Sequence, residues 1–152
     1  LRRPARRPIH CSIAGKMGLE DISIVTGSGS EQLTGNASAV LNEVATMLAA
    51  LAERGESGIV DLGGLPMSSA DKAWLTEKLG QGEIEMSLDI GGPSKIRETA
   101  FHGVWWLVHH NDKGVLTGEF IEVTRVPELV SAHIDDIRRA AVNLGFLAND
   151  NH

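Results

Sequence analysis

The side chains best suited to chemistry are histidines and glutamates in the second half of the chain. Glu98, His102 and His109 stand close together in the sequence. Two imidazoles and a carboxylate can bind a transition metal, and a histidine beside a carboxylate can transfer protons. One hypothesis for this chain is therefore a small metal-dependent or acid/base enzyme that uses these three side chains. It requires that the three converge in one pocket.

No catalytic motif supports that enzyme hypothesis. His109 and His110 are adjacent, so on a strand they point to opposite faces and cannot bind one metal together. The tract Gly27–Ser30 lacks the Gly-Lys that completes a phosphate-binding loop, and no His-Glu-x-x-His motif is present. Cys11 is the one cysteine, which leaves no partner for an internal disulfide or an iron–sulfur cluster. We expect no catalytic residue, no bound metal and no cofactor.

An aromatic run follows Glu98. It contains Phe101, Trp105 and Trp106, in a chain with three Trp and no Tyr. If this segment is a strand, its two adjacent Trp side chains point to opposite faces. One can enter the core, and the other then needs a helix, a partner or water. A large exposed aromatic side chain is typical of a contact surface. The alternative is that helices cover both faces and both Trp are core residues.

Carboxylates accompany this run on strands that we expect to be neighbours. Glu98 precedes the run, and Glu122 lies on the following strand. We predict that Phe101, Trp105 and Trp106 are apolar anchors for a protein partner. We predict that Glu98 and Glu122 are polar groups that orient this partner.

The elements that would position these residues follow from hydrophobic periodicity. Apolar residues recur at helical spacing in three segments and alternate or cluster as in strands in five others. The expected helices are 37–54, 69–79 and 127–144, and the expected strands are 58–62, 83–90, 96–101, 104–109 and 115–124. This order predicts an α+β fold. An antiparallel meander of four to five strands would carry about three helices packed mainly on one face.

The chain is predicted to form one folded domain with looser ends. Residues 1–35 contain Pro and a Gly/Ser tract, which indicates a poorly ordered arm with a candidate edge strand at 21–25. Residues 36–146 form the α+β domain, and residues 147–152 form a tail. A length of 152 residues is enough for one domain with a real core.

Charge and hydropathy exclude some classes of function. The net charge is −6, yet the first eight residues contain four Arg and no acid, so the remainder carries −10. An acidic body argues against nucleic acid as a partner. No segment approaches the roughly 20 apolar residues of a membrane span, and no signal peptide is recognisable. We expect a cytoplasmic protein that does not insert into a membrane.

Several segments together resemble the hydrogenase expression/formation proteins of the HupH/HoxQ/HyaF family. Their order and spacing carry the resemblance, which covers roughly residues 37–145. His102 stands where the family usually has Pro. The segments are Ile59–Leu62, Leu65–Ser68, Gly80–Glu85, Ile96–Trp106 and Glu119–Leu129.

The resemblance implies an accessory, chaperone-like protein of [NiFe]-hydrogenase maturation. It implies binding to an immature hydrogenase subunit, expected to be the small, iron–sulfur-bearing subunit precursor, alongside a thioredoxin-like maturation protein. It implies no catalysis by this chain. A generic homodimerisation domain, in which the Trp face joins two copies, is a further alternative.

Overall fold

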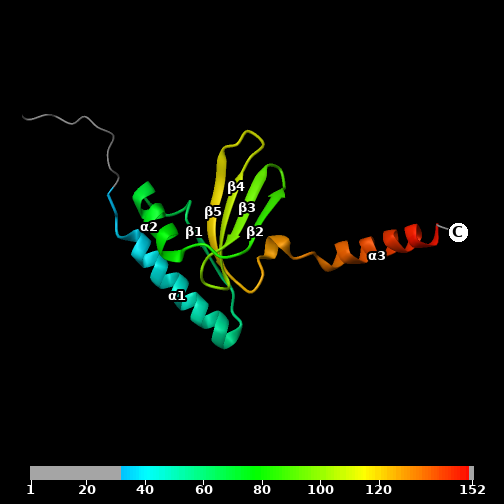
Figure 1. Ribbon diagram of the computed structural model, residues 1–152, viewed down its shortest axis with the longest axis horizontal. Coiled ribbons are helices and arrows are strands. Elements are labelled where there is room, and N and C mark those ends of the chain that lie inside the picture. The colour runs from blue at the N-terminus through cyan, green and yellow to red at the C-terminus, as the bar shows by residue number, and fades with distance from the viewer. Residues whose placement is uncertain (1–31, 151–152) are drawn as a thin grey trace, which may run out of the picture.

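The computed structural model describes residues 32–150 (Figure 1). This part of the chain contains three α-helices, a 3₁₀-helix and a five-stranded sheet. The elements are α1 (Asn36–Arg54), β1 (Gly58–Asp61), α2 (Ser69–Leu79), β2 (Glu85–Asp89), β3 (Pro93–Glu98), β4 (Val104–His110), β5 (Leu116–Val123), η1 (Glu128–Val130) and α3 (Ile134–Asn149).

The sheet is antiparallel throughout, with the strand order β1-β5-β4-β3-β2. Strands β2 to β5 form a meander, and β1 pairs with the far edge of β5. The α+β class, the antiparallel meander and the number of helices are thus confirmed.

Helices α1 and α2 cover one face of the sheet, which we call the helix face (Figure 1). Val40 and Val44 of α1 and Leu75 and Leu79 of α2 pack there against strand residues such as Ile121. The opposite face, which we call the open face, carries a smaller cluster. Ile96, Trp105 and Leu107 form its buried centre, with Val130 of η1 packed against them.

Helix α2 begins at a capping box. The Ser68 hydroxyl oxygen accepts from the Asp71 backbone N–H, and Asp71 accepts from the Ser68 backbone N–H. Asp71 also accepts two hydrogen bonds from Thr34, so this buried carboxylate joins the segment before α1 to the start of α2. Such reciprocal bonds satisfy backbone N–H groups that a helix start leaves unpaired.

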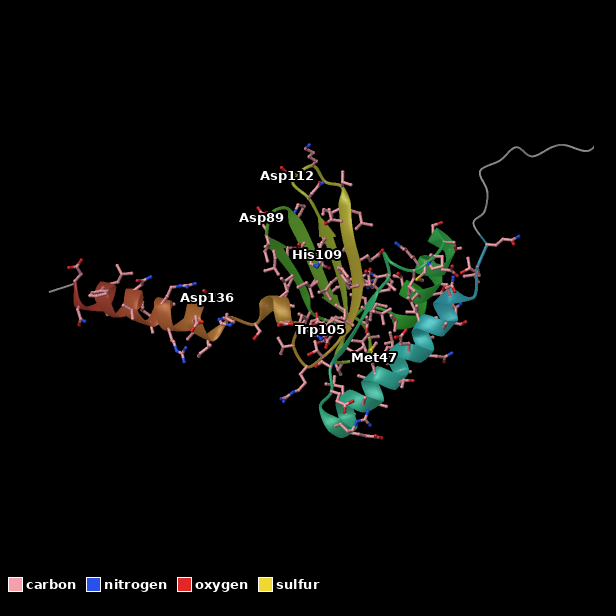
Figure 2. All side chains as sticks on the ribbon, turned by 180° about the vertical axis from the view of Figure 1, so that it is seen from behind. Met47, Asp89, Trp105, His109, Asp112 and Asp136 are labelled. Carbon is pink, nitrogen blue, oxygen red and sulfur yellow. The ribbon has the colours of Figure 1, made fainter. Side chains whose placement is uncertain are left out.

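The C-terminal segment differs from the expected single helix over 127–144. It forms η1, a three-residue link and then α3, which continues to Asn149. Ser131 and His133 are extended, and the His133 ring nitrogen accepts from the Asp135 backbone N–H, so a new helix starts there. Helix α3 stands away from the sheet and from the other helices, and none of its side chains is buried (Figures 1 and 2).

The candidate edge strand at 21–25 and nearly all of the expected arm lie outside the described residues. The division into arm, domain and tail therefore stays a prediction. Among the helices of residues 32–150, none combines the length and the apolar character that crossing a bilayer requires.

Candidate functional site

The predicted site residues separate onto the two faces of the sheet. Strand register places Glu98 opposite Trp105, and Trp105 opposite Glu122. Directly paired residues share a face, so these three form one row across the open face. Ile59 of β1 pairs with Glu122 and extends the row to the sheet edge. Trp106 points to the helix face.

Trp105 is buried, with an exposed fraction of 5%. Its indole N–H donates to the Thr124 carbonyl oxygen at 3.0 Å. It clusters with Ile96 and Leu107, onto which Val130 of η1 packs. A buried indole with a satisfied N–H is a structural element of this face and not an exposed anchor.

Trp106 is buried as well, at 3% exposure, within the core beneath α1 and α2. Its indole N–H donates to Glu119 Oε1 at 3.0 Å, and Lys72 Nζ of α2 lies 2.5 Å from Glu119 Oε2. The Arg97 guanidinium stacks over the ring, 5.0 Å from its centroid. Of the two alternatives for this pair, the one in which both Trp are core residues therefore holds, and the one with an exposed Trp does not. Helices cover Trp106, whereas the segment around η1 covers Trp105.

Phe101 is the exposed aromatic residue of the run, at 49%. It lies in the turn between β3 and β4 and lines a groove along α1. Thr99 holds this turn, since its hydroxyl oxygen accepts from the Phe101 N–H at 3.2 Å. Partner binding by Phe101 and by the other predicted site residues stays a prediction.

The three side chains of the enzyme hypothesis do not converge. His102 Nδ1 lies 3.3 Å from Glu98 Oε1, which makes one pair. His109 is instead hydrogen-bonded to Ser94 Oγ at 2.9 Å. Ser94 and Glu98 are four residues apart on one strand, about 13 Å at the usual rise. In Figure 2, Trp105 and His109 accordingly lie at different heights on the sheet. Within residues 32–150, no three His, Cys, Asp or Glu side chains are grouped as metal ligands.

A hollow of about 430 Å³ opens beside Glu122 on the open face. Leu107 and His109 belong to its lining, and Ile59 and Leu129 stand at its sides with 58% and 39% exposure. Two carboxylates, Glu122 and Glu128, complete it. Glu122 Oε1 accepts from the Glu128 backbone N–H at 3.2 Å, which links η1 to β5. The hollow thus offers apolar walls beside two acidic groups.

Ile59 and Leu129 were not among the residues that the sequence suggested. Ile59 belongs to the expected short apolar strand 58–62, and its pairing with Glu122 places it on the open face, where it is exposed. Leu129 was expected on the buried stripe of one long helix, whereas in η1 it rims the hollow. The exposure of both residues depends on which elements pack beside them, and hydrophobic periodicity in the sequence carries no information on that packing.

Comparison with known proteins matches this domain to one family. Residues 34–149 match the model of the HupH hydrogenase expression protein, C-terminal conserved region. The chain is 35% identical over 103 residues to the hydrogenase expression/formation protein HoxQ of Azotobacter vinelandii, and 31% identical over 86 residues to HupQ of Azotobacter chroococcum mcd 1. These alignments cover 65% and 57% of this chain but 35% and 30% of the relatives. The chain thus spans about a third of the length of these relatives.

A solved structure supports the same assignment. The hydrogenase expression protein HupH from Thiobacillus denitrificans ATCC 25259 is 42% identical, with a TM-score of 0.74. The match covers 78% of this chain and 99% of that one. The chain described here therefore belongs to the HupH hydrogenase expression protein family, whose C-terminal conserved region it carries.

Proposed function

We propose that this chain is an accessory protein of hydrogenase maturation that binds an immature hydrogenase subunit and catalyses no reaction itself. Membership of the HupH family supports the accessory role. The small, iron–sulfur-bearing subunit precursor is the partner we propose, with a thioredoxin-like maturation protein as a second one. The proposed place of action is the cytoplasm.

The observation that carries this proposal at the residue level is the hollow beside Glu122. Its exposed apolar walls, Ile59 and Leu129, can take an apolar side chain of a partner. Glu122 and Glu128 can attract a Lys or Arg that neighbours this side chain. An incompletely folded protein exposes apolar side chains that its mature form buries, so the apolar walls of the hollow suit a client of that kind.

The other predicted residues contribute to this surface in different ways. Glu98 and Trp105 are buried in the same row, and we assign them the role of holding the open face in shape. Phe101 and Trp106 belong to the helix-face side. Exposed Phe101 is therefore a candidate for a second contact, at a distance from the hollow, and Trp106 would act only through the core.

Co-purification with a hydrogenase small-subunit precursor tests the proposal. The unmodified chain should retain the precursor, and Ile59→Asp or Glu122→Gln should weaken retention by about 10-fold or more, as at a binding hot spot. Val115→Asp is the matched control, because Val115 has 57% exposure, close to the 58% of Ile59, but lies at the β4–β5 hairpin. A further variant, Phe101→Ala, tests whether the precursor also contacts the groove along α1.

Retention that is equal in all variants would remove the hollow from the proposal. Loss only in Phe101→Ala would move the docking surface to the α1 side. Absence of any precursor in the eluate of the unmodified, folded chain would refute the proposed function itself.

A further inference from the structure

Helix α3 is an amphipathic helix without a partner in the described part of the chain. Ile134, Ile137, Leu144 and Leu147 are 52%, 50%, 68% and 66% exposed. At 100° per residue, they share one side of the helix with Ala140, Ala141 and Ala148. A helix of this length is marginally stable in water when nothing packs against it. The apolar stripe therefore indicates a binding surface.

The charged residues of α3 leave this stripe free. Arg138 and Arg139 pair with Asp135 and Asp136 of the same helix, one turn earlier. These pairs lie outside the apolar stripe, so its residues meet no charge on their own side of the helix. An apolar groove is thus a better match for the stripe than a charged surface.

Such a groove runs along α1 on the helix face. It encloses about 540 Å³ and is lined entirely by apolar residues. Leu79 and Val104 are buried beside it, and half-exposed Phe101 belongs to the lining. From α1 come Leu41, Val44, Ala45, Leu48, Ala49 and Ala52. The small alanine side chains allow another helix to approach to the 8–10 Å that separates packed helix axes.

The two surfaces match in spacing and in the order of large and small residues. Helix α1 presents Leu41, Ala45, Leu48 and Ala52 to the groove, whereas α3 presents Ile137, Ala141, Leu144 and Ala148. Both series have steps of four, three and four residues, which is the spacing of a coiled-coil seam. Both alternate a large and a small side chain. Each series is about 16 Å long, so large side chains of one helix can pack over alanines of the other.

The same chain does not supply the α3 that fills its own groove. Val130, just before the link, packs on the open face with Trp105 and Leu107, whereas the groove lies on the helix face. The link 131–133 has three residues and spans at most about 10 Å. Passing around the sheet and reaching the level of α1, about 10 Å from the sheet, requires more chain than this link provides.

We propose that α3 docks into the α1 groove of a second copy, and that the two copies exchange their α3 helices reciprocally. Because each copy carries both the projecting helix and its seat, a two-fold arrangement fills both seats at once and closes the dimer. The matched series are about 16 Å long and a helix is about 10 Å wide, so reciprocal exchange covers four such footprints, on the order of 600 Å². That area is typical of a weak interface, which fits a dimer that forms at tens of micromolar. The proposal does not depend on the hollow beside Glu122; it shares with the proposed function only Phe101, which lines the groove.

Light scattering coupled to gel filtration tests the exchange with the full chain. The unmodified protein should elute at about twice its 16.3 kDa at tens of micromolar. Leu144→Asp should weaken the dimer about 30-fold or more. Phe146→Asp is the matched control, because Phe146 is 72% exposed and lies on the opposite side of α3 from Leu144. A monomeric unmodified protein, or a dimer that Leu144→Asp leaves intact, would overturn the proposal.

Cross-linking then identifies the seat. In a Cys11→Ser background, Ala45→Cys and Ala141→Cys introduce one thiol near the middle of each series. A short bismaleimide should join them between two chains, and it should not join Ala45→Cys to Asn143→Cys, on the far side of α3. Cross-links within one chain would overturn the exchange. A dimer that depends on Leu144 but gives no cross-link would overturn the α1 groove as the seat.

Discussion

Trp105 and Trp106 are adjacent in the chain but stabilise different parts of the molecule. Trp106 belongs to the core under the helices, and Trp105 belongs to the cluster of the open face. Each indole N–H has an acceptor, Glu119 for Trp106 and Thr124 for Trp105. Neither ring is accessible to a partner in this structure.

Trp105→Ala should therefore act on stability. Removing a buried indole should lower the free energy of unfolding by about 3–5 kcal/mol. Phe101→Ala removes a half-exposed ring and should cost less than about 1.5 kcal/mol by the same reasoning. Urea unfolding followed by far-UV circular dichroism measures both. Equal losses in the two variants would contradict the difference in burial.

Asp71 makes stability depend on pH. The hydrogen bond from the Thr34 hydroxyl, above all, holds the pKa of this carboxyl below its ordinary value of 3.8; burial opposes the shift. Because the pKa is lower in the folded state, the unfolded chain binds this proton at higher pH than the folded one. The resulting stabilisation is fully present above the unfolded pKa and is lost as pH falls through the folded pKa.

Asp71→Asn should remove this contribution. Its free energy of unfolding should be lower than that of the unmodified protein at pH 6, and the two values should approach each other at pH 3. Thr34→Val should have a smaller effect in the same direction, because it removes one of the hydrogen bonds to Asp71. Urea titrations at the two pH values measure the differences. A difference that grows toward low pH would show that the assigned sign is wrong.

At the level of elements, hydrophobic periodicity predicts a helix or strand correctly where the element buries one side and where capping or turn residues mark its ends. Helix α2 is an example, since Ser68 caps its start and Gly80 follows its end. Strand β2 alternates in sequence, and Met86 and Leu88 are its half-buried residues. Such local patterns also predict the antiparallel meander, because short turns separate β2 to β5.

Hydrophobic periodicity does not predict the break in the C-terminal segment, and it does not predict the hollow beside Glu122. The apolar residues of 127–144 fit one helical stripe, but the link 131–133 divides the segment into η1 and α3. The hollow at Glu122 depends on which residues β1 and η1 bring beside β5. These are long-range pairings, and no local pattern in the sequence specifies them. Exposure of the Trp pair is set in the same way, by what covers each face.

Gly103 is the residue on which the turn between β3 and β4 depends. Its φ of +85° is left-handed, and its carbonyl oxygen accepts from the Thr124 backbone N–H at 2.9 Å. A Cβ there would stand 3.4 Å from both Leu51 Cδ2 and the Thr124 carbonyl oxygen.

Gly103→Ala should thus lower the free energy of unfolding by about 1–2 kcal/mol, the usual cost of a left-handed Ala. Gly145→Ala is the control, because Gly145 is helical and a Cβ there meets nothing within 4 Å. It should leave the protein as stable as before or make it more stable. Thermal unfolding of the two variants measures this, and equal destabilisation would argue against backbone strain at Gly103.

For the whole molecule, the structure offers two separate apolar surfaces. The hollow lies on the open face at β1, β5 and η1, and the groove lies along α1 on the helix face. Because the sheet separates them, partner binding at the hollow and α3 exchange at the groove should respond to different substitutions, except at Phe101, which lines the groove. Ile59→Asp should leave the proposed dimer intact, and Leu144→Asp should leave the hollow intact.

Titration calorimetry of the purified chain with an isolated small-subunit precursor tests the central claim most directly. The proposal predicts saturable binding that weakens about 10-fold or more in Ile59→Asp and is unchanged in Val115→Asp. The mature subunit, assembled in its hydrogenase, should bind more weakly than the precursor. Absence of binding to the precursor by folded protein, or equal binding of precursor and mature hydrogenase, would contradict a role in maturation.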